Sequence, residues 1–390
     1  MVDYIELGDV ASVTKLAGFE FTKYFQYNTT GEIIALRAKN IRDGRLDLSD
    51  VHHIDADVSE QLPRSQLHKG DIIFTYTGNG YGDSTIIPES GKFHLAPNIC
   101  KITPEKVEPY FLFKYMRSSE FLQQVENYMV GSSQPTIPMN TVRKLTIPNI
   151  SRDTQRTIAE VLSSLDDKID LLMRQNATLE ALTQTYFRQW FMEEVHDDWK
   201  EELLSNYVDI TRGASPRPII NFIMNGVFPW VKIGDATSSN SIFINNTKEK
   251  IIEEGITKSV IAKKGDIILS NSATCGLPYI MGIDGCVHDG WLIFKNYRHL
   301  TKWYVYFLLQ AMQREITQQA DGTVQDNLNT SILKNITIKV PDTTSITKFD
   351  ELSETIIEKI EQNNAQIQTL QKLRDTLLPK LINGEVRVKQ

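Results

Sequence analysis

The chain has 390 residues, 41% hydrophobic and 23% charged, which is enough for two or three globular domains. No apolar run approaches the roughly 20 residues of a membrane-spanning helix, and the first residues do not resemble a signal peptide. The 3 cysteines form no Cys-x-x-Cys pair, which argues against a disulfide framework or a zinc site and indicates a reducing cytoplasm. The formal net charge of −7 is unlike that of a free-standing nucleic-acid binder, so any basic surface must be local or supplied by partners.

In chain order, residues 1–150 consist of short β-like runs broken by Gly, Asn and Pro, with an embedded helix expected at 109–128. A long helix is expected from about 153 to 191, because apolar residues recur there at the alternating three- and four-residue spacing of a coiled-coil seam. A second β-like region, with an embedded helix at 301–319, precedes a second helix of the same spacing. We therefore predict four segments, with bounds 1–150, 151–195, 196–342 and 343–390.

The chain also repeats itself. Lys-Gly-Asp-Ile-Ile at 69–73 recurs at 264–268, where each copy is interpreted as a turn that leads into a buried strand. Further matches follow in one shared register: Gly131 and Gln134 with Gly322 and Gln325, 144–147 with 335–338, 168–170 with 359–361, Thr178-Leu179 with Thr369-Leu370, and Leu182 with Leu373. The protein is therefore predicted to be a tandem duplication.

Two long helices with matching seams are expected to pack on each other in antiparallel fashion. Asn176 and Asn363 interrupt the two seams, and a buried polar residue at such a position can fix the register at some cost in stability. The alternative is that both asparagines are exposed. The predicted fold class is α+β, with two β-rich domains joined by two long antiparallel coiled-coil helices in a pseudo-two-fold tandem repeat.

Such a duplication suits a DNA duplex, because DNA-binding dimers place two readers on half-sites related by a two-fold axis. Here the two readers lie in one chain and differ in sequence. They are therefore expected to read two unlike half-sites, separated by a spacer that neither domain reads.

Motifs in the second half carry a family resemblance. Gly-Ala-Ser-Pro at 213–216, followed by Pro-Trp at 229–230, resembles the Gly-x-Ser/Thr-Pro and Pro-Trp stretch that opens many target-recognition domains of type I restriction–modification specificity subunits. The duplicated Lys-Gly-Asp-Ile-Ile and the two closing helices match that family as well. The first half lacks Gly-x-Ser-Pro, and Ile34-Ala35 stands where Pro-Trp is expected, so its assignment depends on the repeat and on residues 40–44.

The resemblance implies a function and a set of partners. Each recognition domain is expected to read one half of a bipartite site in double-stranded DNA. The helices are expected to dock two methyltransferase subunits, which use S-adenosylmethionine to methylate adenine at N6. Whether two restriction/translocase subunits, with their ATP and Mg, join the complex stays open, and no cofactor or metal is expected in this chain.

Candidate DNA contacts are polar and basic residues in predicted loops, since Arg and Lys can bind guanine or phosphate, and Asn and Gln can read adenine. In the first domain they are Lys23, Tyr24, Arg37, Lys39, Asn40, Arg42, Arg45, Tyr76, Asn79, Tyr81, Gln134 and Thr136. In the second domain they are Arg212, Ser215, Arg217, Lys232, Ser238, Ser239, Asn271, Ser272, Thr274, Gln325 and Asn327.

A candidate protein-docking stripe lies on the first long helix. Its members fall partly off the coiled-coil seam, so they either bind a partner helix or complete the chain's own core. They are Leu171, Met173, Leu182, Phe187 and Phe191.

No catalytic residue is predicted. The glycine-rich stretch at 78–82 lacks the Gly-x-Gly-x-x-Gly spacing, and neither a phosphate-binding loop nor the Asn-Pro-Pro-Tyr motif of amino-methyltransferases occurs. Two alternatives stay open: an adaptor whose β-rich domains bind proteins, which the acidic balance favours, and a nuclease, which metal-dependent cleavage by the isolated chain would support.

Overall fold

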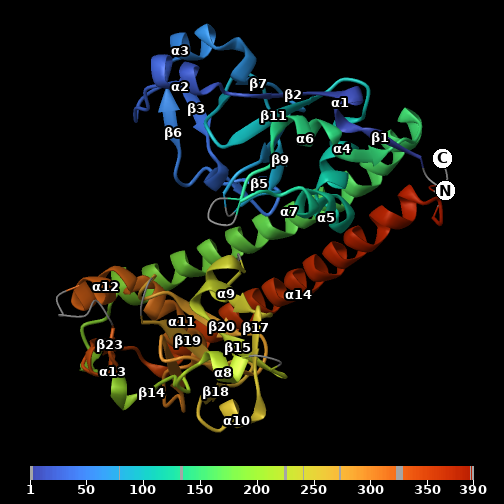
Figure 1. Cartoon of the computed structure of the whole chain (residues 1–390). Coiled ribbons are helices and arrows are strands. Elements are labelled where there is room, and N and C mark those ends of the chain that lie inside the picture. Colours follow the sequence, from blue (N-terminus) through green and yellow to red (C-terminus); the bar gives the residue numbers. More distant parts are fainter. Residues whose placement is uncertain are drawn as a thin grey trace. The chain divides into compact units, whose positions relative to one another are not determined.

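The structure is a computed structural model that describes residues 3–78, 80–131, 135–223, 226–239, 241–271, 274–321, 328–386 and 388. The chain forms two compact units (Figure 1). Unit 1 comprises Met1–Ile169 and Gln368–Gln390, and unit 2 comprises Asp170–Ile367. Among the described residues, no helix is long and apolar enough to cross a membrane.

Unit 1 contains two four-stranded sheets. The first is antiparallel, in the order β2 (Ala11–Lys15), β11 (Ile99–Pro104), β8 (Ile72–Thr75) and β9 (Ser84–Ile86). The second has the order β6 (His52–Ile54), β3 (Ile33–Leu36), β10 (Phe93–Leu95) and β7 (Gln66–Leu67), and its central strands β3 and β10 are parallel. Two short pairs complete the strands: β1 (Tyr4–Glu6) with β12 (Thr146–Pro148), and β4 (Ile41–Arg42) with β5 (Arg45–Leu46).

Short helices connect these strands. They are α1 (Leu7–Val10), α2 (Gly18–Tyr24), η1 (Ala38–Asn40), α3 (Ala56–Gln61), η2 (Pro63–Ser65), α4 (Pro109–Met116), α5 (Ser119–Asn127) and α6 (Met139–Lys144). The single helix expected at 109–128 is in fact two helices, α4 and α5. The break occurs because Ser118 begins a new helix, with its side chain accepting a hydrogen bond from the backbone N–H of Phe121.

Unit 2 repeats this plan. One sheet has the order β14 (Asp209–Arg212), β22 (Trp291–Lys295), β19 (Ile267–Ser270), β20 (Pro278–Met281) and β16 (Phe243–Ile244). The other has the order β17 (Glu249–Ile251), β15 (Phe228–Val231), β21 (Gly285–Val287) and β18 (Val260–Ala262), with β13 (Lys200–Leu203) paired to β23 (Thr337–Val340) outside both sheets. Its short helices are η4 (Leu204–Asn206), α8 (Ile220–Ile223), α9 (Ile233–Ser238), α10 (Glu253–Ile256), α11 (Lys302–Ala311), α12 (Gln313–Asp321) and α13 (Thr330–Lys334).

The repeated Lys-Gly-Asp-Ile-Ile is a turn before a buried strand in both units, as the sequence predicts. Gly70 and Gly265 adopt a φ of +89°, a conformation that glycine accepts without steric cost. The strands that follow, β8 and β19, are buried at every position and sit in the middle of their sheets. A strand that is buried on both faces has a nearly continuous apolar sequence, and this makes the two copies of the motif easy to recognise in the sequence.

The two long helices are α7 (Arg152–Arg188), which ends in a π-helical turn at Gln189–Glu193 (η3), and α14 (Thr343–Ile382). In unit 1 the start of α7 packs with the end of α14, since Ile158 and Leu162 share a core with Leu378 and Leu381. In unit 2 the end of α7 packs with the start of α14, around Phe187 and Phe349. The two helices are therefore antiparallel in each unit, and the predicted α+β class is correct.

Candidate nucleic-acid interface

Strand register defines which residues of the two units are equivalent. In the β3–β6 pair Ala35 lies opposite His52, and in the β15–β17 pair Trp230 lies opposite Glu249. Each of these central strands is followed directly by a basic residue, Arg37 in unit 1 and Lys232 in unit 2. The same backbone frame therefore presents a cation at the same strand end in both units, as the repeat predicts.

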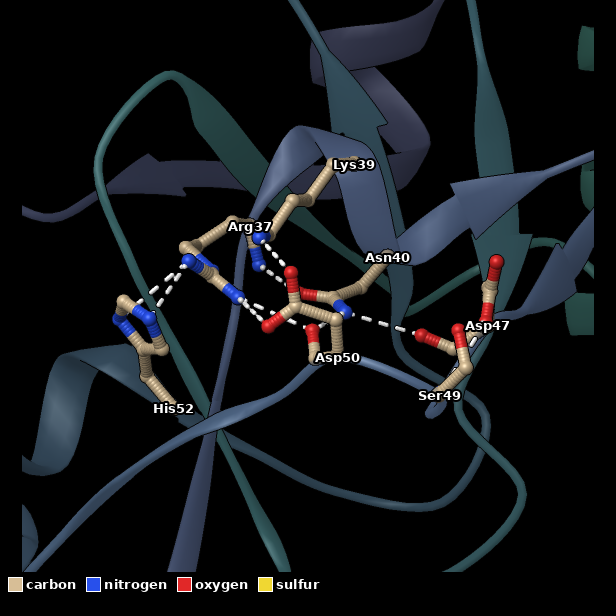
Figure 2. A network of polar contacts seen from close by, with 7 residues as sticks. All are labelled: Arg37, Lys39, Asn40, Asp47, Ser49, Asp50 and His52. Atoms are coloured by element: carbon tan, nitrogen blue, oxygen red, sulfur yellow. Dashed lines mark hydrogen bonds and ion pairs between the residues drawn. The ribbon is translucent and has the colours of Figure 1, made fainter. Parts of the chain in front are cut away.

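In unit 1 the side chain of Arg37 is held by acceptors on both sides (Figure 2). Its Nη1 lies 3.0 Å from Nε2 of His52, and its Nη2 donates a hydrogen bond to the carbonyl oxygen of Asp50. Lys39 forms an ion pair with the Asp50 carboxylate. The hydrogen bond from Lys39 and the attraction of Arg37 keep the pKa of Asp50 below its ordinary value.

Asn40 organises this loop from the inside. Its Oδ1 accepts from the backbone N–H of Arg37 at 3.0 Å, and its Nδ2 donates to the carbonyl oxygens of Asp47 and Asp50. The side chain is buried, so the prediction that Asn40 contacts DNA is wrong in this structure. An amide with all of these bonds inside the protein has a structural role, and it fixes the loop that carries Arg37 and Lys39.

The β4–β5 hairpin presents two further arginines. Its turn residues Asp43 and Gly44 both have positive φ, the conformation of the tightest hairpin turns. Arg42 and Arg45 precede and follow this turn, and both are exposed. Arg42 lies 3.6 Å from the carboxylate of Asp47, a weak surface pair that leaves it accessible to a phosphate.

The other predicted residues of unit 1 are more dispersed. Lys23 is exposed, and its Nζ lies 4.8 Å from the ring centre of the half-buried Tyr24. Tyr76 and Tyr81 are half-buried against the core, and Thr136 bonds to Thr77 through their hydroxyls at 2.6 Å. Asn79 and Gln134 lie outside the described residues.

In unit 2 the strand-end cation is paired with an acid. Nζ of Lys232 lies 2.5 Å from Oε1 of Glu249, which occupies the position of His52. The backbone N–H of Lys232 donates to the carboxylate of Asp235 at 2.9 Å, as that of Arg37 does to Asn40. The loop geometry is thus repeated, while the chemistry of the side chains differs.

Four predicted contacts of unit 2 converge on Asp289, which the sequence did not single out. Ser215 donates to its Oδ1 at 2.6 Å, and Arg217 to its Oδ2 at 3.0 Å. Arg212 and Asn271 both donate to its backbone carbonyl oxygen, at 2.7 and 3.0 Å. We call these five residues the Asp289 cluster. The sequence-based prediction missed Asp289 because an acidic side chain is not expected beside the negatively charged phosphates of DNA.

The contacts of Asp289 and His288 determine the protonation state of each side chain. Partial burial alone acts to raise the pKa of Asp289, but the hydrogen bond from Ser215 and the nearby Arg217 lower it below the ordinary value. Burial lowers the pKa of the neighbouring His288, whose Nδ1 accepts a hydrogen bond from the N–H of Gly290. Near neutral pH the cluster therefore holds an ionised carboxylate beside a neutral imidazole.

Asn271 is a second correction. It is fully buried, and its amide nitrogen bonds to the Asp289 carbonyl oxygen, so it supports the loop and is not available to DNA in this structure. Ser238 and Ser239 donate back to carbonyl oxygens of their own helix α9, and Thr274 is exposed. Ser272, Gln325 and Asn327 lie outside the described residues.

The predicted docking stripe divides in two. Phe187 and Phe191 are buried in the core of unit 2 against Tyr304 and Phe349, so their assignment to a partner surface is wrong. They face inward because the end of α7 packs against α11, through Tyr304, as well as against α14, through Phe349. Met173 is half-buried beside α14, where it borders the same cavity as Ile360.

Two leucines of the stripe are exposed. Leu171 and Leu182 are each 42% exposed, and their separation of eleven residues, about three helical turns, puts them on one face of α7. The repeat partner of Leu182 is Leu373 on α14, which is 45% exposed. The tandem repeat in the sequence pairs these two leucines, but the predicted stripe covers the first long helix only and therefore omits Leu373.

Within the part of the chain that the structure describes, no group of three or more His, Cys, Asp or Glu residues could hold a metal ion. Basic and polar groups stand at equivalent strand ends of the two units, and they are of the residue types with which proteins contact nucleic acids.

Comparison with known proteins gives the family. The model of the type I restriction modification DNA specificity domain matches the chain twice, at residues 2–181 and 196–374. The chain is 27% identical over 307 residues to the type I restriction enzyme MjaIX specificity subunit of Methanocaldococcus jannaschii, which covers 72% of this chain and 69% of that protein. It is 22% identical to the HindI specificity subunit of Haemophilus influenzae, over 97% of this chain and 98% of that protein.

A solved structure has the same fold. The crystal structure of the type I restriction–modification S subunit from M. genitalium matches with a TM-score of 0.56 and 16% identity, over 97% of this chain and 96% of that one. This chain therefore belongs to the family of type I restriction–modification specificity subunits, which recognise DNA and are not themselves catalytic.

Proposed function

We propose that this chain reads a bipartite, asymmetric DNA target, with one half read by each β-rich domain and an unread spacer between the halves. The observation that carries the proposal is the pair of equivalent strand ends. Their backbone register is the same, but Arg37 and His52 stand in one unit where Lys232 and Glu249 stand in the other. Two domains that share a backbone arrangement but carry different side chains there are suited to recognise two different DNA sequences.

The long helices are proposed to dock two methyltransferase subunits. Support comes from Leu182 and Leu373, which are equivalent in the repeat and are both exposed apolar residues. Two copies of one surface are expected to bind two copies of one partner. S-adenosylmethionine then belongs to the methyltransferase, which methylates adenine at N6, and ATP and Mg belong to a restriction/translocase subunit where one is present.

The test is to co-express the chain with the methyltransferase of its own system and map the methylated adenines in the host genome. A split, asymmetric motif that is methylated once on each strand is expected. Replacement of residues 1–150 by another such domain should change one half of that motif and leave the other intact. A swap that changes both halves together, or an assembled complex that methylates no adenine, contradicts the proposal.

A further inference from the structure

Asp289 is an acidic residue at the centre of a set of DNA-binding candidates. Its side chain is 43% exposed, and its two oxygens each accept one side-chain hydrogen bond, from Ser215 and Arg217. A carboxylate oxygen can accept about two hydrogen bonds, so an exposed carboxylate held in this way keeps acceptor capacity. The cluster also holds the carboxylate in one position, because the backbone N–H of Asp289 donates a hydrogen bond to the hydroxyl of Ser215 at 3.3 Å.

The position has no acidic equivalent in unit 1. In the parallel strand pairs, Ala35 lies opposite His94 and Trp230 lies opposite Cys286. Three residues after these partners come Pro97 in unit 1 and Asp289 in unit 2. Pro97 has no side-chain acceptor and borders a recess of about 430 Å³ beside Arg37, Phe21 and Tyr27. The two domains therefore differ in polarity at one equivalent position.

An acid on a DNA-facing surface repels phosphates, so it weakens sequence-independent binding unless a hydrogen-bond donor meets it. In the major groove the base-edge donors are the amino groups N4 of cytosine and N6 of adenine, whereas guanine and thymine present acceptors. The carboxylate of Asp289 is chemically matched to these amino groups.

We propose that Asp289 is a specificity-determining residue of the second recognition domain, which selects an amino-bearing base, cytosine or adenine, at one position of the second half-site. This inference rests on the proposed function, because it assumes that the second domain reads one half of a split target. Ser215 and Arg217 act as positioning residues that hold the carboxylate toward the base.

The experiment uses the assembled complex of this chain with its methyltransferase and a DNA library randomised over both half-sites. The variants are Asp289→Asn and Asp289→Ala, and the control is Asp284→Asn. Asp284 is 42% exposed, forms one ion pair with Lys263 at 2.8 Å, and precedes β21 where Asp289 follows it. The control therefore removes the same charge, at similar exposure, from the other end of the same strand.

The unmodified complex is expected to require cytosine or adenine at one position of the second half-site. Asp289→Ala should reduce that discrimination by about tenfold or more and leave all other positions unchanged. Asp289→Asn keeps nearly the same shape and can still accept the hydrogen bond from Ser215. This variant therefore tests the effect of removing the negative charge while the fold is kept. Because an amide can read adenine by a donor and an acceptor, Asn should shift the preference at that position toward adenine.

Three outcomes decide the matter. If both Asp289 variants lower methylation of all targets equally and keep the base preference, Asp289 only positions its neighbours and the inference is overturned. It is also overturned if Asp284→Asn produces the same change as Asp289→Asn. A complex that shows no two-part target even without substitution refutes the proposed function itself, and it does so before any variant is compared.

Discussion

Asn363 donates a hydrogen bond from its Nδ2 to Oδ1 of Asn176 across 2.8 Å, so the two seam-breaking asparagines of unit 2 are partners. Asn176 in turn donates to Oδ1 of Asn364 at 2.9 Å. Asn363 is fully buried, and the alternative that both asparagines are exposed is therefore wrong. The hydrogen bond between the two amides forms in one register only, which gives the helix pair a defined alignment. Its cost in stability is visible at Oδ1 of Asn363, which is buried without a hydrogen-bond partner.

Asn363→Ala is expected to lower the free energy of unfolding by about 1–3 kcal/mol, because the half-buried Asn176 loses the donor to its Oδ1. The double variant Asn176→Leu/Asn363→Leu should recover much of that loss, since an apolar seam needs no such partner. Urea unfolding followed by circular dichroism measures both. Gln362→Ala, at the exposed position just before Asn363, is the control and should change little. Equal effects of the single and the double variants would contradict the pairing.

In unit 1 the two long helices are joined by a different polar contact, an ion network. Asp166 on α7 accepts from Arg374 on α14 at 2.8 Å and pairs with Lys114 of α4 at 2.5 Å. Asp166→Asn leaves the buried Lys114 without its counter-charge and leaves Arg374 with only the exposed Asp375, so we expect a loss of about 3–5 kcal/mol in unfolding free energy. The matched control is Asp375→Asn, which removes an exposed partner of the same Arg374 and should cost less than about 1 kcal/mol. Similar losses from the two variants would show that burial of the network is unimportant.

The same network predicts a pH dependence. Burial alone acts to raise the pKa of Asp166, but Lys114 and the hydrogen bonds from Tyr110 and Arg374 together bring it below its ordinary value. A carboxyl whose pKa is lower in the folded state stabilises the fold above its unfolded pKa, about 3.9, and this contribution is lost as the pH falls through the folded value. The difference in unfolding free energy between the unmodified chain and Asp166→Asn should therefore be largest above about pH 5 and shrink in acid. A difference that grows in acid would contradict this assignment.

The fold could be predicted because its signals are local and duplicated. The apolar runs of β8 and β19 and the seam spacing of α7 and α14 are visible in the sequence, and the repeat provides each of them twice. The break between α4 and α5 was missed because both halves carry a helical apolar pattern, and only the cap at Ser118 separates them.

The site could be predicted only in part, because side-chain direction depends on tertiary contacts. Arg37 and Lys232 were found by charge, and the structure puts them at equivalent strand ends. Asn40 and Asn271 carry the amide group that can read a base, but in the structure their side chains point inward and donate hydrogen bonds to backbone carbonyl oxygens. Asp289 lies between two repeated strands, and nothing in its local sequence marks the four side chains that reach it from other parts of unit 2.

The β4–β5 hairpin predicts a salt effect. If Arg42 and Arg45 contact phosphates, the double variant Arg42→Ala/Arg45→Ala should weaken binding to all DNA sequences alike. Each lost phosphate contact should reduce the slope of log K against log salt concentration by about 0.9, and hence by about 1.8 for the pair. Fluorescence anisotropy of the assembled complex at several salt concentrations measures this. Lys92→Ala removes a lysine paired with Glu89 and is the control; a loss of discrimination between bases in the hairpin variant would indicate base contact.

The duplicated leucines predict the stoichiometry of the complex. Leu182→Glu introduces a charge into a proposed apolar interface, and an unpaired charge buried there should weaken association by about a hundredfold or more. Because Leu373 is its repeat partner, we expect Leu182→Glu and Leu373→Glu each to release one methyltransferase subunit and the double variant to release both. Native mass spectrometry of the co-purified complex counts the subunits, and circular dichroism verifies that the variants are folded.

Ala181→Glu is the control for this experiment. Ala181 is also exposed but lies about 100° around the helix from Leu182, so the same charge falls outside the proposed stripe. It should leave two methyltransferase subunits bound. If Ala181→Glu releases a subunit as readily as Leu182→Glu, the contact depends on the general charge of α7 and not on the leucine. If neither single leucine variant loses a subunit, the methyltransferases dock on another surface of the chain.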